Sequence, residues 1–133
     1  MTDDLPTPKE IIAMHEEIEE AYDLKYKGER IAAPRLKLRE DVVDPAAEYD
    51  DPWHRAAVLL FGIQRAHVFE DANKRTAWAV TMEYLNDQDL AVDFQQDDDV
   101  IEQIVRRAGL FDTDELAEWL ETGEIDESKL PEH

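Results

Sequence analysis

The chain has 133 residues, with 34 acidic side chains against 14 basic ones and no cysteine. This length fits one domain with a hydrophobic core of its own. The lack of cysteine excludes disulfides, thiolate metal sites and a thiol nucleophile. The formal net charge of −20 argues against direct binding to nucleic acid, whose phosphates attract basic proteins.

The acidic composition is typical of a protein that works at high salt. At about 1 M salt the screening length falls to about 3 Å, so neighbouring carboxylates repel one another weakly. We therefore expect a halophilic protein, with an ordinary acidic cytoplasmic protein as the alternative. The N-terminus lacks the basic and apolar regions of a signal peptide, and no apolar run has the length of a membrane span. These features predict a cytoplasmic protein without membrane contact.

The first predicted helix begins at Pro8, because Thr7 is a good N-cap and Glu10 completes a capping box. Apolar and aromatic residues then recur at helical spacing, which predicts one buried face. These residues are Ile11, His15, Ile18, Tyr22 and Tyr26. We interpret His15 as a core histidine, and Gly28 as the end of the helix.

Residues 28–50 are predicted to be irregular, because Pro34 and Pro45 interrupt them. Leucines and cations alternate from residue 35 to 39, which predicts a short extended flap with the cations on one face. These cations are Arg35, Lys37 and Arg39. We expect them to attract an anionic ligand or an acidic patch on another protein. Alternatively, they pair with the acidic surface and help to close the fold.

Two central helices follow, and both are mostly apolar. The first starts at Asp51-Pro52, a cap followed by proline, and is expected to end near His67. Its residues 56–63 are apolar almost all round, as in a helix buried on most sides. The second runs from about Asn73 to Leu85. The pattern predicts two buried helices, joined by a short polar loop, at the centre of the protein.

The remaining chain predicts an extended piece at 91–94 and a helix from about Asp97 to Ala108. A last helix is capped by Asp112 and ends before Gly123. We thus expect an all-α helical bundle over residues 1–123, with at most a small extended flap. Residues 124–133 are expected to form a polar C-terminal tail.

The loop between the central helices carries the chemistry. It offers His67 as a base for an attacking hydroxyl, and Asp71 as an oxygen ligand for a hard cation such as Mg²⁺. Lys74 and Arg75 are cations for phosphate oxygens, and the helix that begins here supplies free N–H groups. Singly, these residues are also typical of a helix cap or a turn. Together, they are the parts that phosphoryl or nucleotidyl transfer needs.

The run from His67 to Arg75 resembles the signature of the Fic/Doc family, H-x-F-x-D/E-x-N-x-R. The resemblance implies a mostly helical fold with the motif loop between two central helices. It implies that His67 is the catalytic base and that Phe69 anchors the loop in the core. It implies Asp71 as the Mg²⁺ ligand, Asn73 as the residue that orients phosphate or metal, and Arg75 as a phosphate-binding arginine.

Two positions are similar to the Doc branch of the family. Lys74 stands where AMP-transferring Fic proteins have glycine, and Trp78 stands where they have a second arginine. The resemblance to Doc implies a toxin that uses ATP and Mg²⁺ to phosphorylate a translation factor similar to elongation factor Tu, and that a separate antitoxin neutralises. The segment Gly28–Pro34 departs from the Gly-Leu-Pro-Gly-like stretch of Doc, a region that helps to dock the target. The alternatives are a nucleotidyl transferase that modifies protein hydroxyls, and a non-catalytic binding module with the same fold.

Overall fold

The computed structural model describes residues 5–25, 27–92 and 98–130. Over these ranges the chain contains helices and no β-strand, so the predicted all-α class is confirmed. None of the described helices is both long and apolar enough to cross a lipid bilayer. The α-helices are α1 (Pro8–Tyr22), α2 (Pro34–Leu38), α3 (Asp44–Ala47), α4 (Pro52–Ala66), α5 (Asn73–Asp87), α6 (Asp98–Arg106) and α7 (Thr113–Thr122).

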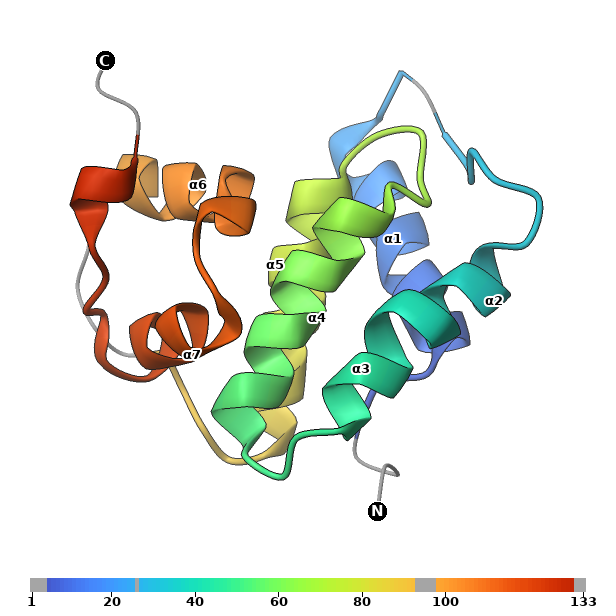
Figure 1. The fold of residues 1–133 in the computed structure, drawn as a ribbon. Helices are drawn as coiled ribbons and strands as arrows, with labels where there is room; N and C mark the ends of the chain where they lie inside the picture. The colour runs from blue at the N-terminus through green and yellow to red at the C-terminus, as the bar shows by residue number, and fades with distance from the viewer. Residues whose placement is uncertain (1–4, 26, 93–97, 131–133) are drawn as a thin grey trace.

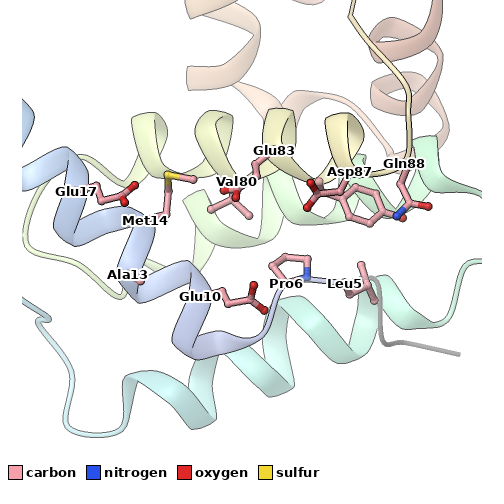
Figure 2. Close-up of a pocket in the computed structure, with 11 residues that line it drawn as sticks. Leu5, Pro6, Glu10, Ala13, Met14, Glu17, Val80, Glu83, Asp87 and Gln88 are labelled. Atoms are coloured by element: carbon pink, nitrogen blue, oxygen red, sulfur yellow. The ribbon is translucent and has the colours of Figure 1, made fainter.

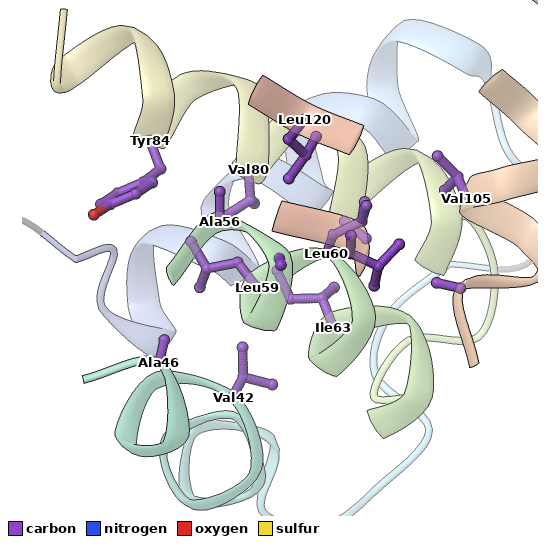
Figure 3. Close-up of a cluster of buried hydrophobic side chains, with 14 of the residues drawn as sticks. Val42, Ala46, Ala56, Leu59, Leu60, Ile63, Val80, Tyr84, Val105 and Leu120 are labelled. Atoms are coloured by element: carbon purple, nitrogen blue, oxygen red, sulfur yellow. The ribbon is translucent and has the colours of Figure 1, made fainter. Parts of the chain in front are cut away.

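Helix α4 lies at the centre, between α5, α7 and the α2–α3 segment (Figure 1). Its side chains Leu59, Leu60 and Ile63 are fully buried in one hydrophobic cluster, which the other helices complete (Figure 3). Helix α5 packs against both α4 and α1. The prediction of two buried central helices is therefore confirmed, and α4 and α5 form a rigid frame for the loop between them.

The predicted helix starts at Thr7, Asp51 and Asp112 are also confirmed. Each of these three side chains accepts a hydrogen bond from a backbone N–H in the first turn of its helix. The first and last of these helices carry the complete capping box, with Glu10 and Glu115 bonding back to the cap. Local caps thus fix where the helices enter the bundle.

Helix α1 is shorter than predicted. It ends at Tyr22, because Asp23 takes a left-handed conformation (φ 48°) and terminates the helix before Gly28. The first apolar positions are buried as expected, but Tyr22 is 58% exposed. Tyr26 lies outside the described residues.

Residues 34–47 are helical, so the prediction of an irregular region was wrong there, although residues 28–33 and 48–50 lack regular structure as expected. The prediction of an extended flap at residues 35–39 was wrong. Pro34 and Pro45 each occupy a first helical turn, where proline is tolerated, and a π-helical turn joins α2 to α3. Leu36 is 56% exposed and Leu38 is fully buried. Residues two apart in a helix are rotated by about 200°, so the leucines cannot share a face. Lys37 instead forms an ion pair of 2.5 Å with Asp41.

The C-terminal helices lie close to their predicted positions. Helix α6 replaces the helix expected from Asp97 to Ala108, and a 3-10 turn follows it. Asp97 itself, together with the predicted extended residues 93 and 94, lies outside the described ranges. After α7, Lys129 forms an ion pair of 2.7 Å with Glu115, which ties residues 127–129 to the first turn of α7. The domain boundary at residue 123 stays a prediction.

Candidate functional site

The loop between α4 and α5 makes a sharp turn with two strained residues. His67 and Ala72 both adopt left-handed backbone conformations, with φ of 47° and 63°. Such conformations cost free energy for residues other than glycine and persist only where surrounding contacts hold them. Between them, Val68 and Phe69 are fully buried, whereas the next two side chains, Glu70 and Asp71, are exposed. The loop is therefore anchored in the core by two apolar side chains and exposes its carboxylates to solvent.

Asn73, the first residue of α5, is bonded back to Phe69 within the loop. Its side-chain amide donates to the Phe69 carbonyl at 3.0 Å, and its side-chain oxygen accepts from the Phe69 N–H at 3.3 Å. The amide of Asn73 is thus engaged with the loop backbone. Its expected contact with phosphate or metal stays a prediction.

A short extended segment supports the loop from outside. Glu29 forms an isolated antiparallel bridge with Phe69. In this bridge the Arg30 N–H donates to the Val68 carbonyl at 2.8 Å, and the Glu70 N–H donates to the Gly28 carbonyl at 3.0 Å. A flap beside the motif loop therefore exists, but it consists of residues 28–30 and not of residues 35–39.

The loop opens onto a cleft of about 1030 Å³ between the end of α1, the start of α5 and α6. This volume lies near the upper end of ordinary ligand pockets, which are roughly 300–1,000 Å³. Five of the candidate residues line the cleft: His67, Asp71, Asn73, Lys74 and Arg75. Phe69 is fully buried and does not line the cleft, and neither do the cations at 35, 37 and 39.

A second, smaller groove of about 440 Å³ lies along α1 and α5 and contains none of the motif side chains (Figure 2). Four carboxylates border it: Glu10, Glu17, Glu83 and Asp87. Because it is acidic and distant from the motif loop, it is not the place for an anionic nucleotide.

The start of α5 makes the cleft suitable for an anion. Ala72 is the N-cap residue and has no side-chain group that could cap the first N–H groups of the helix. Such groups, with the positive end of the helix dipole, bind phosphate. Lys74 lines the cleft from the first turn, and the Arg75 guanidinium lies 4.2 Å from the centre of the Tyr22 ring. This cation–π contact holds Arg75 at the entrance of the cleft.

Asp71 is the carboxylate of the loop that fits a Mg²⁺ ligand best. It is exposed on the rim, and its Oδ1 accepts a hydrogen bond of 2.7 Å from the Ala72 N–H. The described residues contain no cluster of three or more side chains that would form a protein-only metal site. Magnesium in nucleotide sites usually takes one or two carboxylates together with substrate phosphates and water. Asp71 therefore fits a cation that arrives with a nucleotide.

The structure also brings cleft residues into view that the sequence interpretation missed. Arg30 comes from the flap, and Arg106 lies at the end of α6. Gln64, one turn before His67 on α4, donates to the Arg106 carbonyl at 2.7 Å and so fixes the end of α6 beside the loop. No local signal identifies Arg106, because it is brought here by packing over 31 residues of chain after Arg75.

Comparisons with known proteins agree with this geometry. A model of the Fic/DOC family matches residues 5–85, which include α1, α4, the whole motif loop and all but the last two residues of α5. The chain is also similar to the protein named Toxin Doc from Mycolicibacterium smegmatis, with 40% identity over 63 residues. That match covers 44% of this chain and 48% of the toxin, or about half the length of the relative. Since the family model covers more than half of the chain and includes the entire motif, the protein belongs to the Fic/DOC family.

Proposed function

We propose that this protein is a Doc-like toxin that transfers the γ-phosphate of ATP to a hydroxyl group of a target protein. The observation that carries the proposal is the gathering of His67, Asp71, Lys74 and Arg75 around one cleft at the uncapped start of α5. Its similarity to a relative named Toxin Doc supports the toxin role. We further propose a translation factor of the elongation factor Tu type as the target, a separate antitoxin as the inhibitor, and the cytoplasm as the place of action.

In this mechanism His67 removes the proton from the target hydroxyl as its oxygen attacks the γ-phosphorus. The bond between the γ-phosphorus and the bridging oxygen breaks, ADP leaves with the bond electrons, and the phosphate ester forms on the target. Lys74, Arg75 and the first N–H groups of α5 hold the phosphate chain and balance its charge. Mg²⁺, bound through Asp71, would supply further charge neutralisation at the phosphates.

The position of Lys74 and Trp78 on the cleft wall favours phosphate transfer over AMP transfer. A lysine beside the phosphates supplies a cation that glycine cannot. Trp78 offers an aromatic ring where a second arginine would hold another phosphate. The cleft therefore favours a nucleotide position for transfer of the γ-phosphate over one for transfer of AMP.

The test uses ATP labelled at either the α- or the γ-phosphate, with purified elongation factor Tu as the first candidate target. We expect label from the γ position on the target, and a loss of about 10²–10⁴-fold in rate for His67→Ala, the usual contribution of a general base. Label from the α position alone would establish AMP transfer in place of the kinase reaction. A His67→Ala variant within a few-fold of wild type would exclude His67 as the base.

A further inference from the structure

His15 is a buried histidine that the proposed reaction does not use, and it touches the motif loop twice. Only 1% of its surface is exposed. Its Nε2 lies 2.9 Å from the backbone carbonyl of Asp71, 56 residues away in the chain. Its ring stacks on Phe69, with ring centres 3.7 Å apart and planes 8° from parallel. Because a carbonyl oxygen can only accept, the Nε2–H group is the donor.

The other side of the His15 ring continues toward the flap. Nδ1 of His15 lies 3.8 Å from Oε2 of Glu19, one turn further along α1. The same Glu19 oxygen accepts a hydrogen bond from the Gly28 N–H. Glu19 is only 13% exposed at its side chain, so this acceptor is largely shielded from water. One face of α1 thus connects the motif loop to residue 28 of the flap.

These contacts go beyond what core packing requires. An apolar ring at position 15 would satisfy core packing alone, because burying an imidazole and a carboxylate is costly unless their polar atoms are used. Both groups bond to backbone atoms of the active-site loop and its flap. The loop itself contains two left-handed residues other than glycine, so it depends on such external support.

We propose that His15 and Glu19 form a positioning pair that sets the backbone of Asp71 and the flap in the geometry that the reaction needs. His15 holds the Asp71 carbonyl, and thereby the direction in which the Asp71 side chain leaves the loop. Glu19 holds Gly28, whose carbonyl bonds to the loop at Glu70. Neither residue lines the cleft. The part of this proposal that concerns catalysis rests on the proposed function.

Loss of this pair should impair Mg²⁺ binding and turnover more than it impairs nucleotide affinity. Partners that orient a metal ligand typically contribute 10–100-fold in metal affinity or activity. We expect His15→Phe to lower kcat, and to raise the Mg²⁺ concentration for half-maximal activity, by roughly 10–100-fold. The KM for ATP should change less, because Lys74 and Arg75 belong to the regular first turn of α5.

Amide hydrogen exchange of the free protein tests the positioning without any reaction. The Arg30 and Glu70 amides bond across the bridge between flap and loop. In His15→Phe and in Glu19→Ala both should exchange roughly 2- to 10-fold faster, the effect of losing one hydrogen bond. His15→Gln keeps an N–H donor and should restore part of the protection and of the kcat. Glu20→Ala, an exposed change on the same helix, is the matched control and should leave both readouts unchanged.

Exchange rates and kcat of His15→Phe within two-fold of wild type would overturn the proposal and leave His15 as a packing residue. Equal losses in His15→Phe and His15→Gln would overturn the role of the hydrogen bond to Asp71. If His15→Phe does not fold, by circular dichroism, His15→Gln and Glu19→Ala decide by the same readouts. If the wild-type protein transfers no phosphate, the proposed function fails, whereas the exchange experiment still decides whether His15 and Glu19 hold the loop.

Discussion

His54 connects the start of α4 to α7 and gives the protein a pH-dependent contact. Its Nδ1 lies 2.7 Å from Asp51 Oδ2, and its Nε2 lies 2.8 Å from Asp114 Oδ1. Carboxylate oxygens only accept, so both ring nitrogens donate and the imidazolium form is favoured. The hydrogen bond to Asp51 raises the pKa of His54 above its ordinary value, burial opposes this, and Asp114 raises the pKa further. Replacing the ring by glutamine removes the charge and weakens both contacts.

The size of the effect follows from the exposure of the partners. The side chain of His54 is 30% exposed and that of Asp114 is 86% exposed, so water screens the second contact strongly. Ion pairs near the surface contribute about 0.2–1 kcal/mol each. We therefore expect His54→Gln to cost about 1 kcal/mol of unfolding free energy at pH 6, which is a fall in Tm of about 4 °C for a chain of this size.

The sign with pH follows from the raised pKa. Stability from a histidine whose folded pKa is raised is fully present below the unfolded value of about 6.5, and is lost as the pH rises through the folded pKa. Thermal unfolding of wild type and His54→Gln from pH 5.5 to 9 measures it. The difference in Tm between wild type and His54→Gln should be largest at pH 6 or below, and should decrease as the pH rises above the pKa of His54 in the folded protein. A difference that stays constant or increases with rising pH would refute the reasoning, and Asp114→Asn should show a smaller version of the same profile.

Two further predictions concern the cations. Arg106→Ala should raise the KM for ATP by roughly 3- to 10-fold through loss of a charged contact to phosphate. Arg107→Ala is the control and should leave the KM unchanged, because Arg107 does not line the cleft. If steady-state kinetics give Arg106→Ala the KM of the wild type, Arg106 does not belong to the site. Reversing Arg35, Lys37 and Arg39 to glutamate should leave the KM for ATP unchanged, because none lines the cleft, but should weaken antitoxin binding measured by calorimetry. Unchanged antitoxin affinity would reduce this cluster to surface pairing such as that of Lys37 with Asp41.

The sequence predicts the centre of the fold well because its signals there are local. Caps at Thr7, Asp51 and Asp112 and the all-round apolar stretch of α4 belong to single helices, and the motif loop is a continuous run. The alternation at residues 35–39 was misleading because two leucines are too few to establish a period of two. In the helix that forms, Leu38 packs in the core and Leu36 is exposed.

The candidate site was predictable only as far as it is continuous in sequence. Arg30, Arg106 and the His15–Asp71 contact join segments that lie far apart along the chain, so no spacing rule reports them. The exposure of Tyr22 likewise depends on a contact that is distant in sequence. Tyr22 continues the apolar period of the helix, yet it is exposed and stacks on Arg75, so an aromatic side chain read as core serves the cleft.

Glu83 lies among other carboxylates, so the high-salt hypothesis can be tested at this one residue. Glu83 borders the groove between α1 and α5 (Figure 2). Burial raises the pKa of Glu83, and the charges of Asp87, Glu17 and Glu10 raise it further. A carboxyl whose pKa is raised by folding costs stability once it is ionised, so stability associated with Glu83 is lost as the pH rises through that pKa.

Glu83→Gln should therefore stabilise the protein at pH 7 in dilute buffer, by roughly 0.2–0.5 kcal/mol for the repulsion with Asp87 one turn away. At about 1 M KCl the screening length is about 3 Å, so the gain should largely vanish while the Tm of the wild type rises. Glu102→Gln is the control and should lower the Tm in dilute buffer, because Glu102 forms an ion pair of 3.1 Å with Arg106. Thermal unfolding from 0.05 to 2 M KCl separates the outcomes. A wild-type Tm that is flat or falls with salt, or a stability gain of Glu83→Gln that persists at 2 M KCl, would mean that carboxylate repulsion does not limit stability. The hypothesis of adaptation to high salt would then be abandoned.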